Sequence, residues 1–163
     1  MLQVPKLTII MPVYNTAQYL PRAFEALLKQ VDKSFKLIVV DDGSTDNSAE
    51  VAQSYAKRFP YFKLIKKKNG GPSDARNVGM KYIDTPYVTF HDGDDWVDVE
   101  MYDKMWRRAI ETNSDIVFCE FYTTDGVNYS HIHNNLDTLN KENVLLIIVG
   151  RMLWSLCGGL VRR

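Results

Sequence analysis

Four aspartates follow a short apolar run in the stretch FHDGDDWVD, residues 90–98. Asp92, Asp94 and Asp95 fall so close together that their negative charges repel one another. Water, protons or a bound cation would each relieve this repulsion. Carboxylate oxygens suit Mg²⁺ or Mn²⁺, and such sites commonly use one or two carboxylates together with substrate phosphates. The stretch therefore indicates either a divalent-cation site or an exposed acidic turn, with His91 expected to pack at the strand end rather than to bind metal.

Two more polar motifs follow apolar runs: PVYN at residues 12–15 and DDGSTD at residues 41–46. Pro12 lacks an N–H, so it marks the point where a strand stops donating hydrogen bonds. The aromatic face of Tyr14 and the amide of Asn15 could hold a base and a ribose, or the motif could be a strand end followed by a helix cap at Asn15. A carboxylate of DDGSTD could accept from a nucleobase N–H, or it could favour the positive end of the next helix.

The motif NGGPSDAR, residues 69–76, ends in an arginine in the first turn of an expected helix. The five donors of Arg76 suit uracil carbonyls or phosphate oxygens. The alternative is a surface salt bridge to Asp41 or Asp74. No GKS or GKT follows the glycines, so this is not a Walker loop. The preceding lysines, residues 66–68, are interpreted as a solvated strand end.

These motifs must be positioned by regular elements, and the apolar pattern alternates between two periods. Short apolar runs predict strands at residues 7–13, 36–40, 61–67, 87–91 and 115–122. Apolar residues at helical spacing lie between them: Leu20, Phe24, Leu27, Leu28 and Val31; then Ala52, Tyr55, Ala56 and Phe59; then residues 73–82; then Tyr102, Met105, Trp106, Ala109 and Ile110. A short helix is also expected at residues 141–149. Ser44 or Asp46 is expected to cap the second helix, and Ser73 or Asp74 the third.

Alternating strands and helices predict an α/β fold, a mostly parallel central sheet with helices on both faces. In such sheets ligands bind beyond the carboxyl ends of the strands. The loops after residues 13, 40 and 91 carry the unusual residues, so we expect all three to meet at one edge.

Composition narrows the class of protein. The 163 residues suggest one domain, and 20 basic against 20 acidic side chains give no bulk field for nucleic acid. Cys119 and Cys157 form no CxxC pair, so we expect neither a disulfide framework nor a zinc site. The first ten residues do not read as a signal peptide, and the apolar run at 144–149 is too short for a membrane span.

Taken together, TIIMPVYNTAQYL, LIVVDDGSTDNS, NGGPSDARNVGM and YVTFHDGDDW resemble the family-two glycosyltransferases with a Rossmann-like GT-A fold. The match runs in order over residues 7–96 and continues weakly to the end. The resemblance implies transfer of a sugar from a nucleotide diphosphate donor, usually UDP-linked, with Mn²⁺ or Mg²⁺.

By this resemblance each motif takes a role in donor binding. The nucleotide-binding residues would be Pro12, Val13, Tyr14, Asn15, Asp42, Arg76, Asp92 and Gly93. Asp42 would accept from uracil N3, Asp94 would coordinate the metal, and Asp92 would reach the ribose or a metal-bound water. Gly93 removes a side chain that would crowd the donor. Asp95 would bind the transferred sugar or cap the following turn.

An inverting transferase needs a base for the acceptor hydroxyl, and the family's acidic motif would follow GGLVRR. No base is identified before Arg163. We expect residues 1–163 to be a single donor-binding domain without the acceptor and base part, although a natural short form is the alternative. Glu120, His131 and His133 are weaker candidate bases. The family's setting implies a glycan or lipid-linked acceptor, polysaccharide or cell-envelope assembly, and a cytoplasmic enzyme at the inner membrane face.

Three other classes compete with a transferase. A nucleotide-sugar-binding module without turnover would carry the same donor site. A dinucleotide or methyl-donor domain would need a glycine-rich loop after the first strand, where PVYNTAQY stands instead. A nucleotidyltransferase would also combine carboxylates, metal and diphosphate chemistry.

Overall fold

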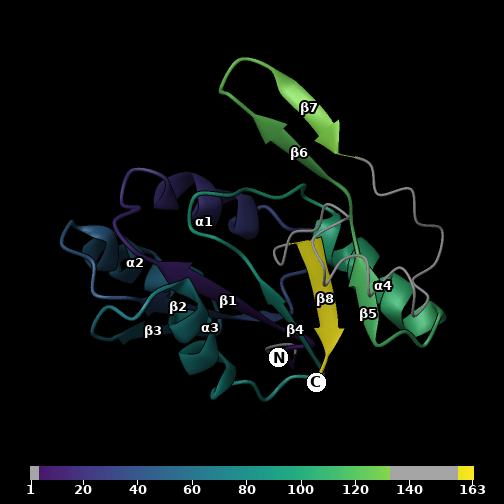
Figure 1. The fold of residues 1–163 in the computed structure, drawn as a ribbon. Helices are drawn as coiled ribbons and strands as arrows, with labels where there is room; N and C mark the ends of the chain where they lie inside the picture. Colours follow the sequence, from purple (N-terminus) through teal and green to yellow (C-terminus); the bar gives the residue numbers. More distant parts are fainter. Residues whose placement is uncertain (1–3, 133–157) are drawn as a thin grey trace.

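The computed structural model describes residues 4–132 and 158–163. Its centre is a six-stranded sheet in the order β3-β2-β1-β4-β8-β5 (Figure 1). Its strands, in that order, are β3 Phe62–Lys66, β2 Phe35–Asp41, β1 Leu7–Val13, β4 Tyr87–Phe90, β8 Gly159–Arg162 and β5 Ile116–Phe118. The first four are mutually parallel, and β8 is antiparallel to both of its neighbours. The predicted α/β class with a mostly parallel sheet is confirmed.

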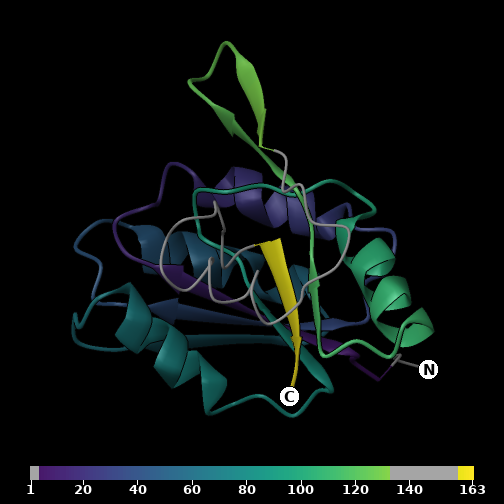
Figure 2. The same cartoon turned by 45° about the vertical axis from the view of Figure 1, so that its right-hand side comes forward.

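Helices cover both faces of this sheet, as expected (Figure 2). The helices are α1 Leu20–Leu28, α2 Ser48–Tyr55, α3 Pro72–Met80 and α4 Met101–Glu111, with a 3₁₀ turn at Ala56–Arg58. Alternate residues of β1, such as Ile9 and Met11, join the core that includes α1, α2 and α4. Ile38 and Val40 of β2 point the other way and pack with Ala75 of α3. This split follows from the two-residue period of a strand.

The sequence predicts the first residue of helix α1 better than its last residue. Pro21 lies in its first turn as predicted, where a missing N–H costs nothing. The helix ends at Leu28, so the expected extension to Val31 is wrong. Val31 is 66% exposed, and its N–H donates to the Val99 carbonyl at 2.9 Å.

The cap predictions for α2 and α3 fare differently. The N-cap of α2 is Asn47, but the Asp46 carboxylate accepts from the Ser48 N–H at 2.9 Å, so Asp46 does serve that helix end. The N-cap of α3 is Gly71, and neither Ser73 nor Asp74 caps it. The helix begins at Pro72, one residue earlier than predicted, because its first turn accommodates proline, and it ends at Met80, two residues before the predicted end.

The run at 115–122 is not one strand, contrary to the prediction. It divides into β5 and β6 Phe121–Thr124, and β6 pairs with β7 Tyr129–Ile132 in a separate hairpin. The division falls where the Cys119 N–H donates to the Gly158 carbonyl at 2.9 Å, at the end of the β5–β8 ladder. The hairpin stands away from the sheet (Figure 1). The helix predicted at 141–149 lies outside the described residues.

No helix in the described part of the chain is long and apolar enough to cross a bilayer.

Candidate functional site

The three chemistry-bearing loops do meet at the carboxyl edge of the parallel strands. The Asp42 N–H donates to the Val13 carbonyl at 2.8 Å, which ties the ends of β2 and β1 together. The His91 N–H donates to the Ile10 carbonyl at 3.0 Å, which ties the end of β4 to β1. The loops after β1, β2 and β4 are therefore neighbours, as the topology rule predicted.

The loop after β1 is fastened to the loop after β2 through Asn15. Its side-chain oxygen accepts from the Thr45 N–H at 2.8 Å, and its own N–H donates to the Ser44 hydroxyl at 3.1 Å. Asn15 adopts a positive φ of 51°, a conformation that asparagine tolerates better than most residues. It is not a helix cap, because the N-cap of α1 is Tyr19. Tyr14 beside it is 49% exposed, while Pro12 is half-buried and Val13 buried.

Asp42 lies under the loop between β3 and α3 and is only 3% exposed. Its carboxylate accepts from the N–H of Gly70 at 3.0 Å and of Gly71 at 2.7 Å, and it pairs with Lys67. Burial opposes ionisation, but the hydrogen bonds from Lys67, Gly71 and Gly70 outweigh it and hold the pKa of Asp42 below its usual value. At neutral pH Asp42 is thus a charged group that holds the loop between β3 and α3, here called the glycine loop.

Lys67 is not recognisable as a site residue in the sequence, because the three consecutive lysines at 66–68 together indicate a solvated strand end. Its side chain is only 17% exposed and also contacts Asp74 at 2.7 Å. Nothing in the neighbouring sequence distinguishes Lys67 from Lys66 and Lys68. Its contact with Asp42 depends on how β3 packs beside β2, which the local sequence does not show.

Arg76, the fifth residue of α3, reaches the loop between β4 and α4, residues 91–100, here called the acidic loop. Its terminal nitrogen donates to Asp92 at 2.7 Å, so Arg76 does form a salt bridge, but neither Asp41 nor Asp74, the partners named in the alternative interpretation, is the acid. The Arg76 side chain is 16% exposed, and its guanidinium carbon lies 5.8 Å from the Phe90 ring centroid. Its Nε is buried and has no hydrogen-bond partner in the structure. The Arg76–Asp92 pair joins two of the motifs singled out from sequence.

The carboxylates of the acidic loop become more exposed from Asp92 to Asp95. Asp92 is half-buried, Gly93 is buried, and Asp94 and Asp95 are exposed. The Asp95 N–H donates to the Asp92 carbonyl at 3.1 Å, which closes a tight turn.

His91 is fully buried, which confirms a packing role at the strand end. Its Nδ1 lies 3.2 Å from the Tyr102 hydroxyl of α4. Burial lowers the pKa of His91 to about 4, against the opposing effects of the Asp92 charge and the Asp95 backbone. His91 is neutral at physiological pH.

The donor set fits a Mg²⁺ or Mn²⁺ ion that shares its shell with a ligand. No group of three or more His, Cys, Asp or Glu side chains in the described residues is arranged to enclose a metal. One or two carboxylates completed by phosphate oxygens and water is the arrangement that these hard cations commonly adopt. Asp92 is already paired with Arg76, so exposed Asp94 is the better-placed ligand.

Two of the candidate bases, Glu120 just before β6 and His131 on β7, contact each other. His131 Nε2 lies 2.9 Å from Glu120, and the His131 ring stacks on Tyr122 at 4.4 Å between centroids. His133 lies outside the described residues.

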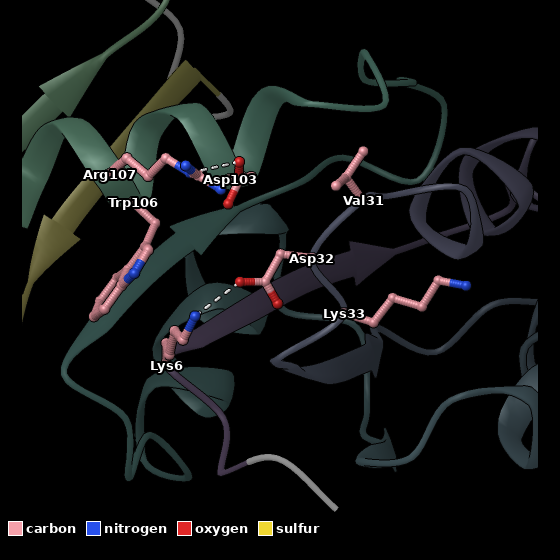
Figure 3. Close-up of a pocket in the computed structure, with 7 residues that line it drawn as sticks. All are labelled: Lys6, Val31, Asp32, Lys33, Asp103, Trp106 and Arg107. Carbon is pink, nitrogen blue, oxygen red and sulfur yellow. Dashed lines mark hydrogen bonds and ion pairs between the residues drawn. The ribbon is translucent and has the colours of Figure 1, made fainter.

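A hollow of about 700 Å³ lies at the opposite, amino edge of the sheet, just before β1 and β2 (Figure 3). It is lined by Lys6, Val31, Asp32, Lys33, Asp103, Trp106 and Arg107. Both of its acids are occupied, Asp32 by Lys6 at 2.9 Å and Asp103 by Arg107 at 2.8 Å. Because both acids of this hollow are already paired and the sequence motifs gather at the other edge, we place the candidate site at the carboxyl edge.

Known proteins resemble this chain in sequence and in fold. The uncharacterized glycosyltransferase EpsJ of Bacillus subtilis is 39% identical over 119 residues, 73% of this chain and 35% of that protein. The cholesterol galactosyltransferase of Borreliella burgdorferi is 36% identical over 117 residues, 72% of this chain and 33% of that protein. This chain thus spans about a third of the length of these relatives.

Solved structures share the fold. The crystal structure of S. aureus TarS 1-349 in complex with UDP-GlcNAc superposes with a TM-score of 0.81 at 25% identity, over 96% of this chain and 45% of that one. The GT-A fold expected from the motifs is therefore confirmed. The model of the family described as Glycosyl transferase family 2 matches residues 8–153. With its ordered motifs, its fold and this match, the chain belongs to glycosyl transferase family 2.

Proposed function

We propose that this chain is the donor-binding part of an inverting, metal-dependent glycosyltransferase that uses a UDP-sugar. The observation that carries the proposal is the meeting of exposed Tyr14, braced Asp42, and the Arg76–Asp92 pair with exposed Asp94 at one sheet edge. TarS, a structural neighbour, is crystallised with UDP-GlcNAc, which supports a uridine donor.

The nucleoside would bind over the first two loops. Tyr14 offers an aromatic face to uracil, and its neighbours Pro12, Val13 and Asn15 shape the floor of this pocket. In the structure Asp42 already accepts from Lys67, from Gly71 and, with both oxygens, from the shared N–H of Gly70. Asp42 would therefore have to release one of these contacts to accept from uracil N3.

The diphosphate would lie between Arg76 and the acidic loop. Arg76 would supply donors to the nucleotide, Asp92 would reach the ribose while it holds Arg76, and Asp94 would bind Mn²⁺ or Mg²⁺. A bound cation stabilises the negative charge that develops on the departing nucleotide diphosphate. Gly93 keeps the loop close to the donor, and Asp95 would contact the transferred sugar.

The acceptor and the base would come from outside the described site. A glycan or lipid-linked acceptor suits the family's cell-envelope setting, and work at the cytoplasmic face of the membrane is part of the proposal. The remaining length of the relatives is where an acidic base for the acceptor hydroxyl is expected. If that part is absent, the same site makes a nucleotide-sugar-binding module without turnover.

Calorimetric titration of UDP with Mn²⁺ and with EDTA tests the donor site. We expect metal-dependent binding, and a loss of at least about tenfold in affinity in Asp94→Asn because a metal ligand is removed. Glu111→Gln, which removes an equal charge at the far end of α4, is the matched control and should bind as the native chain does. Equal affinity in Asp94→Asn would refute the metal role.

Turnover is measured separately, as release of UDP from UDP-sugars with and without candidate acceptors. Release that depends on Mn²⁺ supports a transferase. Tight UDP binding with no release in a chain extended to the length of its relatives would favour the binding module.

A further inference from the structure

The acidic loop, residues 91–100, contains no helix or strand. It leaves the end of β4 at residue 91, passes along α1 and reaches α4 at Met101. Asp94, Asp95 and Trp96 are exposed along this path. An irregular, solvent-facing segment has few contacts of its own to restrict it, so its geometry depends on where it is fastened.

Besides the Arg76–Asp92 pair, the loop is fastened to α1 or its flanks at several points, which include the Val31–Val99 hydrogen bond. At its start, buried Gly93 packs so closely that an added Cβ would lie 3.1 Å from Leu20 and 3.2 Å from the Thr16 hydroxyl. At its end, the side chain of buried Gln30 donates to the Asp98 carbonyl at 2.6 Å and accepts from the Tyr102 N–H at 3.3 Å. Between these points Val97 packs against the core, and the side chain of Trp96 contacts Arg22.

That middle contact is a stack of Arg22 on Trp96. The guanidinium carbon lies 3.2 Å from the ring centroid, and Trp96 remains 38% exposed. Arg22 forms no ion pair with any acid in residues 4–132 and 158–163. Arginine stacks flat on aromatic rings and is attracted to their faces. The stack is therefore what holds both side chains in place.

Trp96 is two positions from Asp94 and next to Asp95. We propose that the Arg22–Trp96 stack is a clamp that positions these two carboxylates for the metal and the donor, which makes Arg22 and Trp96 positioning residues. This inference rests on the proposed function. When the clamp is open, the loop samples geometries in which the two carboxylates do not converge. The apparent affinity for the metal and UDP is then the intrinsic affinity multiplied by the fraction of time that the loop is in the binding geometry.

Calorimetry of UDP with saturating Mn²⁺ tests the clamp with Arg22→Ala, Trp96→Leu and the double variant. An exposed cation–π contact predicts that each single change weakens binding about two- to fivefold. Because both changes break one contact, the double variant should be no weaker than either single one. Lys29→Ala, which removes an exposed cation from the end of the same helix, is the matched control and should leave the affinity unchanged.

The same titrations separate a clamp from direct contact between Arg22 and the diphosphate. Direct contact would leave Trp96→Leu with native affinity and make the two changes additive. Either result would overturn the clamp. A merely structural role would lower the melting temperature in both variants without changing the affinity, and that outcome also contradicts the inference.

Hydrogen exchange of residues 93–100 in the ligand-free protein tests the clamp independently of binding. We expect faster exchange in Arg22→Ala and Trp96→Leu than in the native chain and in Lys29→Ala. Unchanged exchange overturns the clamp. A native chain that binds no UDP refutes the proposed function instead, while the exchange measurement still decides whether the stack restrains the loop.

Discussion

At the scale of single residues, Asp42 combines structural and chemical tasks in one carboxylate. Its two oxygens hold the backbone of Gly70 and Gly71 and the ammonium of Lys67. The glycine loop leads directly into α3, which carries Arg76. A buried acceptor that loses its charge leaves donors without partners, and each such donor costs free energy.

Asp42→Asn is expected to lower the free energy of unfolding by about 1–3 kcal/mol, because an amide presents an N–H to donors that need an acceptor. Because the pKa of Asp42 is lowered by folding, its stabilisation is present above pH 3.8 and is lost as the pH falls through the lower folded value. The difference between native and variant should therefore shrink in acid. Chemical denaturation at several pH values measures it.

Asp74→Asn is the matched control, since Asp74 contacts the same lysine from an exposed position. Exposed ion pairs contribute about 0–1 kcal/mol, so this change should have a small effect. Equal losses in both variants would show that Lys67 pairing, rather than the backbone hydrogen bonds, makes Asp42 important.

At the scale of elements, the distance between α3 and the sheet is set by a missing side chain. A Cβ on Gly79 would lie 2.5 Å from the Ile10 side chain of β1, closer than real contacts allow. Gly79 lets the helix approach the strand, and the helix in turn brings Arg76 to Asp92.

Gly79→Ala should destabilise the fold by about 1–3 kcal/mol through overpacking, despite the better helix propensity of alanine. In combination with Ile10→Ala, which removes the obstructing methyl, the two losses should be less than additive. Asn77→Ala, at an exposed position of the same helix, should change stability by no more than about 0.5 kcal/mol. Thermal unfolding measures all four variants, and simple additivity would contradict the steric explanation.

Strands with β-branched apolar runs, such as β1 and β2, are predictable because a buried parallel strand needs no other signal. The division of 115–122 is not, since the alternation of side chains does not change where β5 ends and β6 begins. That break depends on a partner strand, β8, that is distant in sequence. Likewise, the end of α1 is set by the Val31–Val99 contact rather than by its own apolar spacing.

The candidate site also has features that the sequence predicts and features that it does not. The loops that meet at the sheet edge are predictable from topology, because parallel strands place their carboxyl ends together. The partners of charged side chains are not predictable in this way: Arg76 pairs with Asp92 rather than with Asp41 or with Asp74, which is only two positions away in sequence. Pairing depends on side-chain directions that only the assembled sheet defines.

At the scale of the whole molecule, β8 holds the two halves of the sheet together. It pairs with β4 on one side and β5 on the other, and Leu160 at its centre is fully buried. Leu160→Ala should lower the free energy of unfolding by about 2–5 kcal/mol. Ile116→Ala, on edge strand β5 at 41% exposure, is the control and should cost much less. Denaturant titration measures both, and similar losses would show that β8 is not central to stability.

The place of β8 also has a consequence for synthesis on the ribosome. Strands β1 to β4 contact partners that are made early, so the donor-binding loops can assemble while the chain is still growing. Strand β5 cannot join the sheet until residues 159–162 have emerged, because β8 stands between it and β4. Until then the edge of β4 is unpaired and open to wrong partners. Nascent chains stalled before residue 159 should therefore be the aggregation-prone species of this protein.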